Sequence, residues 1–505
     1  MANFFEKRDR NVIPNWRSFE KTVALGELSN PKKSQKINRI TFSLEEYIKD
    51  WENNQTPCHA GDLISAAISN SQVEIREVLE AANFIIHSGD STIIQKQLAK
   101  KLLNCEQEII NKTLYTLDDF IERPNQYFIY TSINNCKKRI SENPHNFINY
   151  IELSRLYSII GEKDKSIKKM EQALFLNKNN RFALRSASRL YAHFQELDKA
   201  HDILRKNYLM KYDPWLLSCE ISMSRLRGIT SKHIKAGLDI LSSKNFHPFS
   251  ISELASCIGT VEFYNGSMKS SKKLFRQSLV SPNDNSLAQA KWITSENPLF
   301  DLDINTLNLE NNYEALTIES YYSKDWSSTV KYAERWFLDM PFTSRPAWLG
   351  NTVASSLLDN QELSIKFCKA ALVSHPNDPL FSNNIAYSLA LLNRTEEALE
   401  YINKAHKTVD SRINTCIKAT KGLIYFRKGF WDIGKMYYLE SIQEAIDSGN
   451  KKLSWIAILN LAREQMALRS TNKEEIFNLI SKVPDGEPEI DLLKQKIEEL
   501  YRRRL

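Results

Sequence analysis

The chain has little glycine and proline for its length. It holds 14 Gly and 15 Pro among 505 residues, while Leu, Ile, Lys and Glu are plentiful. Glycine and proline interrupt helices and dominate turns, so their scarcity favours a helical fold. A hydrophobic content of 42% is enough for a packed protein and excludes wholesale disorder.

Cysteines are few, and long apolar runs are lacking. The seven cysteines are widely spaced and none belongs to a CxxC pair, which is typical of reduced thiols in a cytosolic protein. The first residues, MANFFEKRDR, lack the apolar run of a signal peptide, and no segment has the length of a membrane-spanning helix. We therefore expect a soluble cytoplasmic protein with no membrane partner.

Catalytic signatures are also lacking. The sequence has no phosphate-binding GxxxxGK[ST], no GxGxxG after a strand, no HExxH and no GxSxG. Its nine histidines show no metal-ligand spacing, and Cys58-His59 is an isolated pair. We expect no enzymatic activity, no cofactor and no metal site. A net charge of +7, from 68 basic and 61 acidic residues, permits an acidic partner without requiring one.

What the chain does contain is a repeat. The turn Glu162-Lys-Asp-Lys-Ser166 recurs 34 residues later as Glu196-Leu-Asp-Lys-Ala200, and Pro214, Pro248 and Pro282 continue at the same interval. Proline suits such junctions because it cannot continue the preceding helix. The clearest unit, 415–446, orders small and aromatic residues along two helical patterns: Gly422, Tyr425, Gly429, Trp431, Gly434, Tyr438 and Ser441.

This order and period resemble the tetratricopeptide repeat (TPR) family. The resemblance implies an all-α fold, an α-solenoid of stacked helix-turn-helix repeats that forms a right-handed superhelix with a concave groove. Along the chain we expect an N-terminal arm (1–42) packed along a helical surface, a helical region with divergent repeats (43–146), TPR-like repeats (147–282), an irregular connector (283–309), further TPR-like repeats (310–446) and C-terminal capping helices (447–505).

In this family the groove is lined by fixed positions of the first helix of each unit. Carried over, those positions give a basic early half: Arg155, Arg185, Arg189, His193 and Arg227. The later half is more aromatic and apolar: Tyr321, Tyr322, Asn383, Tyr387, Leu423, Phe426 and Arg427. Such a groove suits a protein or peptide partner with an acidic part and a hydrophobic anchor. The other interpretation is that the arginines pair with acids on adjacent units and the aromatics are core residues.

The first hypothesis is therefore a non-enzymatic scaffold or adaptor. It predicts that Arg185→Glu combined with Arg189→Glu abolishes partner capture without unfolding the protein. A second hypothesis is nucleic-acid binding, through the basic groove or through residues 95–114. That segment resembles a helix-turn-helix in part, although Leu103 occupies the usual glycine position and Glu106 and Glu108 have the wrong charge for phosphate contacts. A third is an accessory subunit of an enzyme complex that docks through the N-terminal arm.

Overall fold

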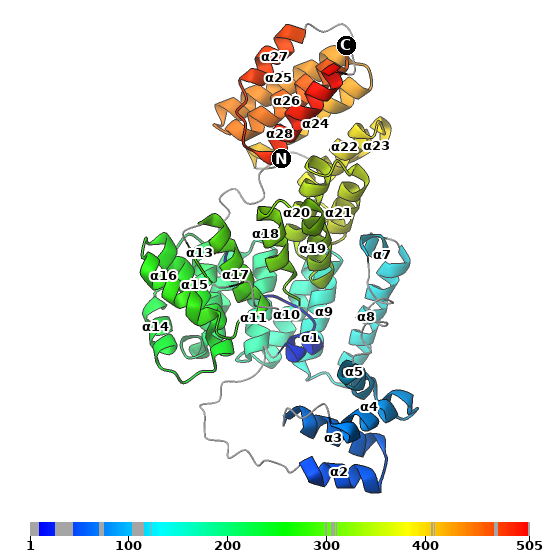
Figure 1. Cartoon of the computed structure of the whole chain (residues 1–505), viewed down its shortest axis with the longest axis vertical. Helices are drawn as coiled ribbons and strands as arrows, with labels where there is room; N and C mark the ends of the chain where they lie inside the picture. Colours follow the sequence, from blue (N-terminus) through cyan, green and yellow to red (C-terminus); the bar gives the residue numbers. More distant parts are fainter. Residues whose placement is uncertain are drawn as a thin grey trace. The chain divides into compact units, whose positions relative to one another are not determined.

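The protein is described here by a computed structural model. It describes residues 10–25, 44–69, 75–103, 116–121, 123–297, 300–302, 304, 309, 311–405, 408, 410–468 and 473–502. These residues form α-helices, one short 3-10 helix and connecting segments, with no β-strand among them (Figure 1). The chain divides into two compact units, residues 32–115 and residues 1–31 with 116–505.

The smaller unit is a group of four described helices: α2 (Leu44–Asn53), α3 (Pro57–Ser69), α4 (Arg76–His87) and α5 (Ile93–Leu102). Its core contains Trp51, whose ring meets Phe84 edge-on at 5.2 Å between centroids, together with Leu63 and Ile85. The segment 95–114, which resembles a helix-turn-helix, begins within α5. Its proposed recognition helix lies outside the described residues.

The larger unit is a succession of helical hairpins. The first group comprises α1 (Phe19–Ala24), α7 (Leu117–Ile121), α8 (Arg123–Glu142), α9 (Phe147–Ile159), α10 (Lys163–Leu176), α11 (Arg181–His193), α12 (Leu197–Arg205), a 3-10 helix (Tyr208–Lys211), α13 (Pro214–Leu226), α14 (Ile234–Ser242), α15 (Pro248–Tyr264), α16 (Met268–Ser278) and α17 (Asp284–Glu296). The second comprises α18 (Tyr313–Tyr322), α19 (Trp326–Asp339), α20 (Ser344–Ser356), α21 (Gln361–Ser374), α22 (Pro379–Leu391), α23 (Thr395–Lys404), α24 (Ser411–Arg427), α25 (Trp431–Asp447), α26 (Lys451–Ala467), α27 (Lys473–Ser481) and α28 (Pro488–Arg502).

The two helices of each hairpin pack against each other, and the first helix also contacts the first helix of the next hairpin. This second kind of contact joins α9 to α11, α11 to α13 and α13 to α15, and later α20 to α22, α22 to α24 and α24 to α26. Neither helix of a hairpin can bury its apolar surface alone, so stacking completes the core. The predicted all-α fold of stacked helical hairpins is confirmed.

The sequence sets the helix boundaries through caps and turns. Asp213 and Asp378 each accept two backbone N–H bonds at a helix start, and Pro214 and Pro379 follow in the first turn, where no N–H is needed. Gly161 ends the α9–α10 turn region with a φ of +72°, a conformation that side chains disfavour. The predicted repeat junctions therefore have a local physical cause.

Small residues let the paired helices approach closely. A Cβ atom added to Gly434 of α25 would lie 2.9 Å from the backbone oxygen of Gly422 on α24, so this crossing requires glycine. Gly422 lies equally close to its partner helix, since a Cβ atom added there would be 3.0 Å from the backbone oxygen of Gly434. Helices α9 and α10 also approach each other closely, and a hydroxyl group bridges them, since Ser154 Oγ donates to Ser166 O at 2.8 Å.

The segment 283–309, expected as an irregular connector, begins with helix α17, which Asn283 caps. Phe300 and Ile304 beyond it are buried with Trp292 in one apolar cluster. At the other end of the chain, α26, α27 and α28 enclose a core of their own that includes Leu459, Met466, Ile490 and Ile497. None of the helices in the described part of the chain combines the length and apolar character needed to cross a bilayer.

Candidate binding sites on the repeat helices

The early repeats hold a segment of their own chain. Residues 10–18, called the arm segment, run without helix to Ser18, which caps α1. Val12 and Trp16 are each 1% exposed, and the Trp16 ring meets Phe342 edge-on at 5.4 Å between centroids. The N-terminal region is therefore anchored by buried apolar side chains.

Polar side chains of α13 and α17 hold the backbone of the arm segment. Ser222 Oγ donates to Val12 O, Asn285 Nδ2 donates to Ile13 O and Gln289 Nε2 donates to Arg10 O, each at 2.9 Å. Carbonyl oxygens are present at every residue, so these bonds fix the path of a non-helical segment without reading its side chains. We call this part of α13 and α17, with the adjoining α18 and the end of α19 at Asp339, the early face.

Acidic side chains of the early face bind the arginines of the arm segment. Arg17 pairs with Asp284 at 2.6 Å and with Asp339 at 2.7 Å, while Arg10 pairs with Glu314 at 2.7 Å. Burial by itself raises the pKa of the Glu314 carboxyl, but Arg10 and Arg345 outweigh it and hold that pKa below its ordinary value. These helices therefore present acids to a basic segment of the chain itself, whereas the sequence predicts a basic groove for a partner that is acidic in part.

Three of the arginines expected in a basic early groove form ion pairs with acids of the same chain. Arg155 pairs with Glu152 at 3.0 Å, Arg185 with Glu253 at 2.9 Å and Arg227 with Asp198 at 2.6 Å. Arg185 is only 8% exposed, donates to Trp215 O at 3.1 Å and also stacks on the Trp215 ring. For these arginines the structure corrects the expectation of a basic groove, because acids on the same unit, on the adjacent unit or two units away neutralise them.

Arg189 and His193, the other two early residues, lie on α11 against a cavity of about 490 Å³. The cavity is bounded by the arm segment on one side and by α18, α19 and α20 on another. Neither residue forms an ion pair with an acid among the described residues. They are the part of the predicted basic set that stays available for a ligand.

In the later repeats, several predicted groove residues belong to the core. Leu423 is fully buried and Phe426 is 6% exposed, with its ring 6.0 Å from that of Tyr438 between centroids. Arg427 donates to Glu464 at 2.6 Å. Packing therefore accounts for Leu423 and Phe426, which corrects their assignment to a partner surface.

Tyr321 and Tyr322 contact each other edge-on, and Tyr322 Oη donates to Glu296 at 2.7 Å.

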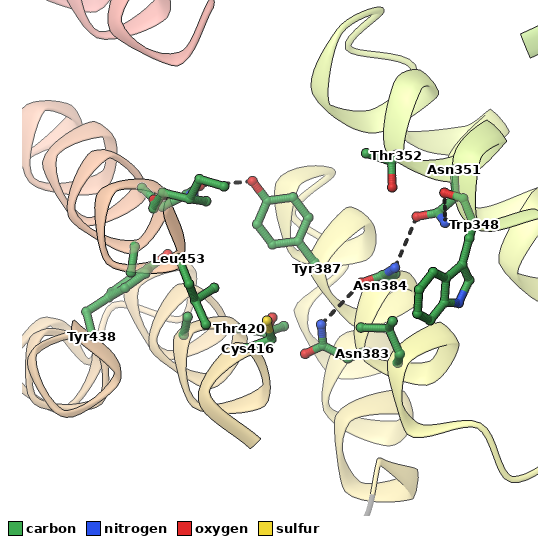
Figure 2. Close-up of a pocket in the computed structure, with 15 residues that line it drawn as sticks. Trp348, Asn351, Thr352, Asn383, Asn384, Tyr387, Cys416, Thr420, Tyr438 and Leu453 are labelled. Carbon is green, nitrogen blue, oxygen red and sulfur yellow. Dashed lines mark hydrogen bonds between the residues drawn. The ribbon is translucent and has the colours of Figure 1, made fainter. Parts of the chain in front are cut away.

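Asn383 and Tyr387 line a pocket of about 70 Å³ that runs across α20, α22, α24 and α26 (Figure 2). We call it the later pocket. Its walls are mostly apolar, with Trp348, Leu380, Leu453, Ile456 and Ala457 among them. These four helices are the first helices of successive hairpins, so the pocket lies along the contacts that join one repeat to the next.

A row of amide side chains crosses the later pocket. Asn384 Nδ2 donates to Asn351 Oδ1 at 3.1 Å, and Asn383 Nδ2 donates to Asn384 Oδ1 at 3.3 Å (Figure 2). Tyr387 Oη donates to Asn460 Oδ1 at 2.9 Å. This network positions Asn383 and Tyr387 without using all of their hydrogen-bonding capacity.

Two buried polar atoms of the later pocket have no hydrogen-bond partner among the described residues, Asn383 Oδ1 and Tyr438 Oη. Asn383 is 4% exposed and Tyr438 is 1% exposed. Burial, followed by the nearby Glu464, raises the pKa of the Tyr438 hydroxyl well above its ordinary value, so it stays protonated and able to donate. The pocket thus offers one acceptor and one donor between apolar walls.

Sequence reasoning missed the residues that hold the arm segment, namely Ser222, Asn285 and Gln289. It also missed Asn351 and Asn384, although these two asparagines stand at nearly the repeat interval. That recurrence is the signal that could have identified the amide row. No comparable signal marks Ser222, because its partner is a backbone atom far away in the sequence.

The fold and its sites place the chain in the class of all-α proteins built from repeated helical hairpins. No protein-family model matches the chain, and no curated protein matches it. Among solved structures it is similar to the TPR2AB domain–pHSP90 complex of yeast Sti1, with 15% sequence identity and a TM-score of 0.20. That match covers 56% of this chain and 95% of the other chain.

Proposed function

We propose that the protein is a non-enzymatic TPR-type scaffold that binds an extended segment of a protein partner in the later pocket. The observation that carries the proposal is the pair of buried polar atoms there, Asn383 Oδ1 and Tyr438 Oη, which form no hydrogen bond with any described residue. A peptide backbone supplies both an N–H donor and a C=O acceptor, and the apolar walls suit one hydrophobic side chain of the partner.

The early face supports this mode of recognition. Its amides and hydroxyl already hold a non-helical backbone, that of the arm segment, through three side-chain bonds to carbonyl oxygens. The later pocket presents amides on the equivalent first helices, from Asn351 on α20 to Asn460 on α26. The same chemistry on the same kind of helix favours the same kind of ligand.

Nucleic-acid binding through the groove is less well supported. It needs several cations free to neutralise phosphates. Arg155, Arg185 and Arg227 are each paired with an acid inside the fold. Docking of an enzyme subunit through the arm is also less well supported, because residues Val12, Trp16 and Arg17 are buried against the chain's own helices.

Selection of peptides from a random display library on the full-length protein tests the proposal. Selected peptides should bind at least about tenfold more weakly to Asn383→Leu and to Tyr438→Phe, a loss of roughly 1.4 kcal/mol or more. Asn143→Leu, at an exposed position after α8, is the matched control and should bind like the parent. Equal binding by the two pocket variants, with folding verified by circular dichroism, would place the peptide site elsewhere.

A further inference from the structure

The cavity beside the arm segment has a wall rich in cations and donors. Its lining includes Arg10 of the arm, Arg189 and His193 of α11, Trp336 of α19 and Arg345 of α20. At about 490 Å³ it has the size of a small-molecule site rather than of a single-ion site. It is separate from the later pocket and shares no lining residue with it.

Several donors on this wall have no acceptor. The Arg189 guanidinium forms no hydrogen bond or ion pair with any described residue, and it lies over the Phe342 ring with its Cζ 5.2 Å from the ring centroid. Trp336 is 4% exposed, and its Nε1–H has no partner within the described chain. His193 Nε2, which is a donor or an acceptor according to the tautomer of the neutral ring, is likewise shielded and unpartnered among those residues. Buried donors without acceptors are costly, so an acceptor-rich ligand is the natural complement.

The charges lining the cavity do not balance. Glu314 is shared between Arg10 at 2.7 Å and Arg345 at 3.2 Å. Asp378 uses its Oδ1 to cap α22, accepting from the backbone N–H groups of Leu380 and Phe381. Burial, followed by the like charge of Arg345, lowers the pKa of Arg189 to about 10, so the group remains a cation at neutral pH. The wall therefore presents three guanidiniums against two carboxylates.

We infer that this cavity binds a small organic or inorganic oxyanion, one that carries phosphate or carboxylate groups, with the Arg189 guanidinium as its principal contact and Trp336 Nε1–H as a second donor. Guanidinium groups present a planar fork of donors that matches both kinds of oxyanion. The ligand also touches the arm segment, which forms one wall through Arg10, Asn11 and Asn15. Binding is thereby expected to hold the arm segment against the early face.

Calorimetric titration of the full-length protein with sodium pyrophosphate and, separately, with sodium citrate tests this inference at constant ionic strength. At least one anion should bind and raise the Tm of the protein. Arg189→Gln should weaken that binding at least tenfold, and Arg189→Lys, which keeps the charge but not the fork, should weaken it less. Arg155→Gln on α9 is the matched control and should bind like the parent.

The two anions distinguish phosphate from carboxylate chemistry, and binding of either supports the site. A decaglutamate peptide is titrated in parallel. Binding of that peptide with neither small anion would overturn the inference in favour of an acidic partner segment. Unchanged anion affinity in a folded Arg189→Gln variant, or no binding of any probe to the parent, would also overturn it. The peptide selection on the later pocket is independent of all these outcomes.

Discussion

The early face and the later pocket use similar side chains on equivalent helices, but only the early face uses them fully. On the early face, Gln289 is wholly buried and engages Arg10 both as a donor and as an acceptor. In the later pocket, Asn383 is almost as buried, yet its Oδ1 accepts no hydrogen bond from any described residue. Amides whose bonds are satisfied stabilise a fold, whereas an unsatisfied buried amide costs stability and marks a place for a ligand.

The two regions also differ in charge. The early face is held by buried ion pairs, such as Arg17 with Asp284 and Asp339. Taking such charges out of water is expensive, and removing one partner leaves the other exposed to that cost. The later pocket has no charged lining residue. We therefore expect substitutions on the early face to affect stability first, and substitutions in the later pocket to affect binding first.

The largest expected effect is the difference in stability between glutamate substitutions at two arginines of α11. Arg185→Glu places a carboxylate against the buried Glu253 and should destabilise the protein by at least about 3–5 kcal/mol. Arg189→Glu, one turn later and facing the cavity, should cost about 1 kcal/mol or less because no acid is paired with Arg189. Urea unfolding of the two single variants measures the difference. Equal losses would show that Arg185 and Arg189 have the same role.

A large loss of stability in Arg185→Glu would also rule out the double variant that the sequence alone suggests as a test of partner binding. The combined Arg185→Glu and Arg189→Glu variant was expected to lose its partner without unfolding. With Arg185 buried against Glu253, the double variant is instead expected to lose its fold, and so it cannot report on binding.

The next effect concerns the arm segment. Trp16→Ala removes a side chain that is 1% exposed and packs against Phe342, so it should cost about 3–5 kcal/mol. Trp431→Ala, at a 50% exposed position, is the matched control and should cost about 0.5 kcal/mol or less. Thermal unfolding of the full chain compares them. A Trp16→Ala variant as stable as the control would show that the arm segment does not contribute to the fold.

Substituting one amide on the early face and one in the later pocket tests the difference between these two regions most directly. Gln289→Leu leaves Arg10 O and an Arg10 N–H without their partner and should cost about 1–3 kcal/mol. Asn383→Leu removes an acceptor that no described residue uses and a single long hydrogen bond, the 3.3 Å donation to Asn384 Oδ1, and should change stability by about 1 kcal/mol or less. Chemical denaturation of both variants gives the two values. A large loss for Asn383→Leu would mean that the later pocket is part of the structural core.

The fold could be predicted from sequence because its determinants are local. Helix starts and the 34-residue interval depend on prolines, caps and small residues, such as Pro214 and Gly434, whose effects act within one hairpin or between adjacent helices. The sites could be predicted only in part. Family positions pointed to Asn383, Tyr387, Arg189 and His193, each of which lies against a cavity.

Ion pairs and the arm contacts depend on folding over longer distances. Arg185 meets Glu253 across 68 residues, and Arg17 meets Asp284 across 267. No pattern within one repeat shows which acid will neutralise which arginine. The all-α fold of repeated hairpins could therefore be predicted, whereas the intramolecular partners of Arg155, Arg185 and Arg227 could not.

The smallest effect expected is a pH dependence that belongs to the cavity of Arg189. Burial, followed by His375 and Arg189, holds the pKa of His193 well below its ordinary value near 6.5. The unfolded chain therefore binds a proton below pH 6.5 that the folded protein does not. Stability should fall as the pH decreases from 6.5, by up to about 1.4 kcal/mol per pH unit for this residue.

His193→Phe should reduce that slope, since an apolar ring can keep the contacts with Phe194 and Phe342. Part of the slope should remain, because the pKa of His375 is also lowered by burial. His145→Gln, at an exposed turn, is the matched control and should leave the slope as in the parent. Free energies of unfolding measured between pH 7 and pH 5 decide the question. If His193→Phe left the pH dependence of the unfolding free energy unchanged, His193 would be protonated as easily in the folded protein as in the unfolded chain. The cavity of Arg189 would then not differ from the uncharged later pocket in the way that burial of His193 predicts.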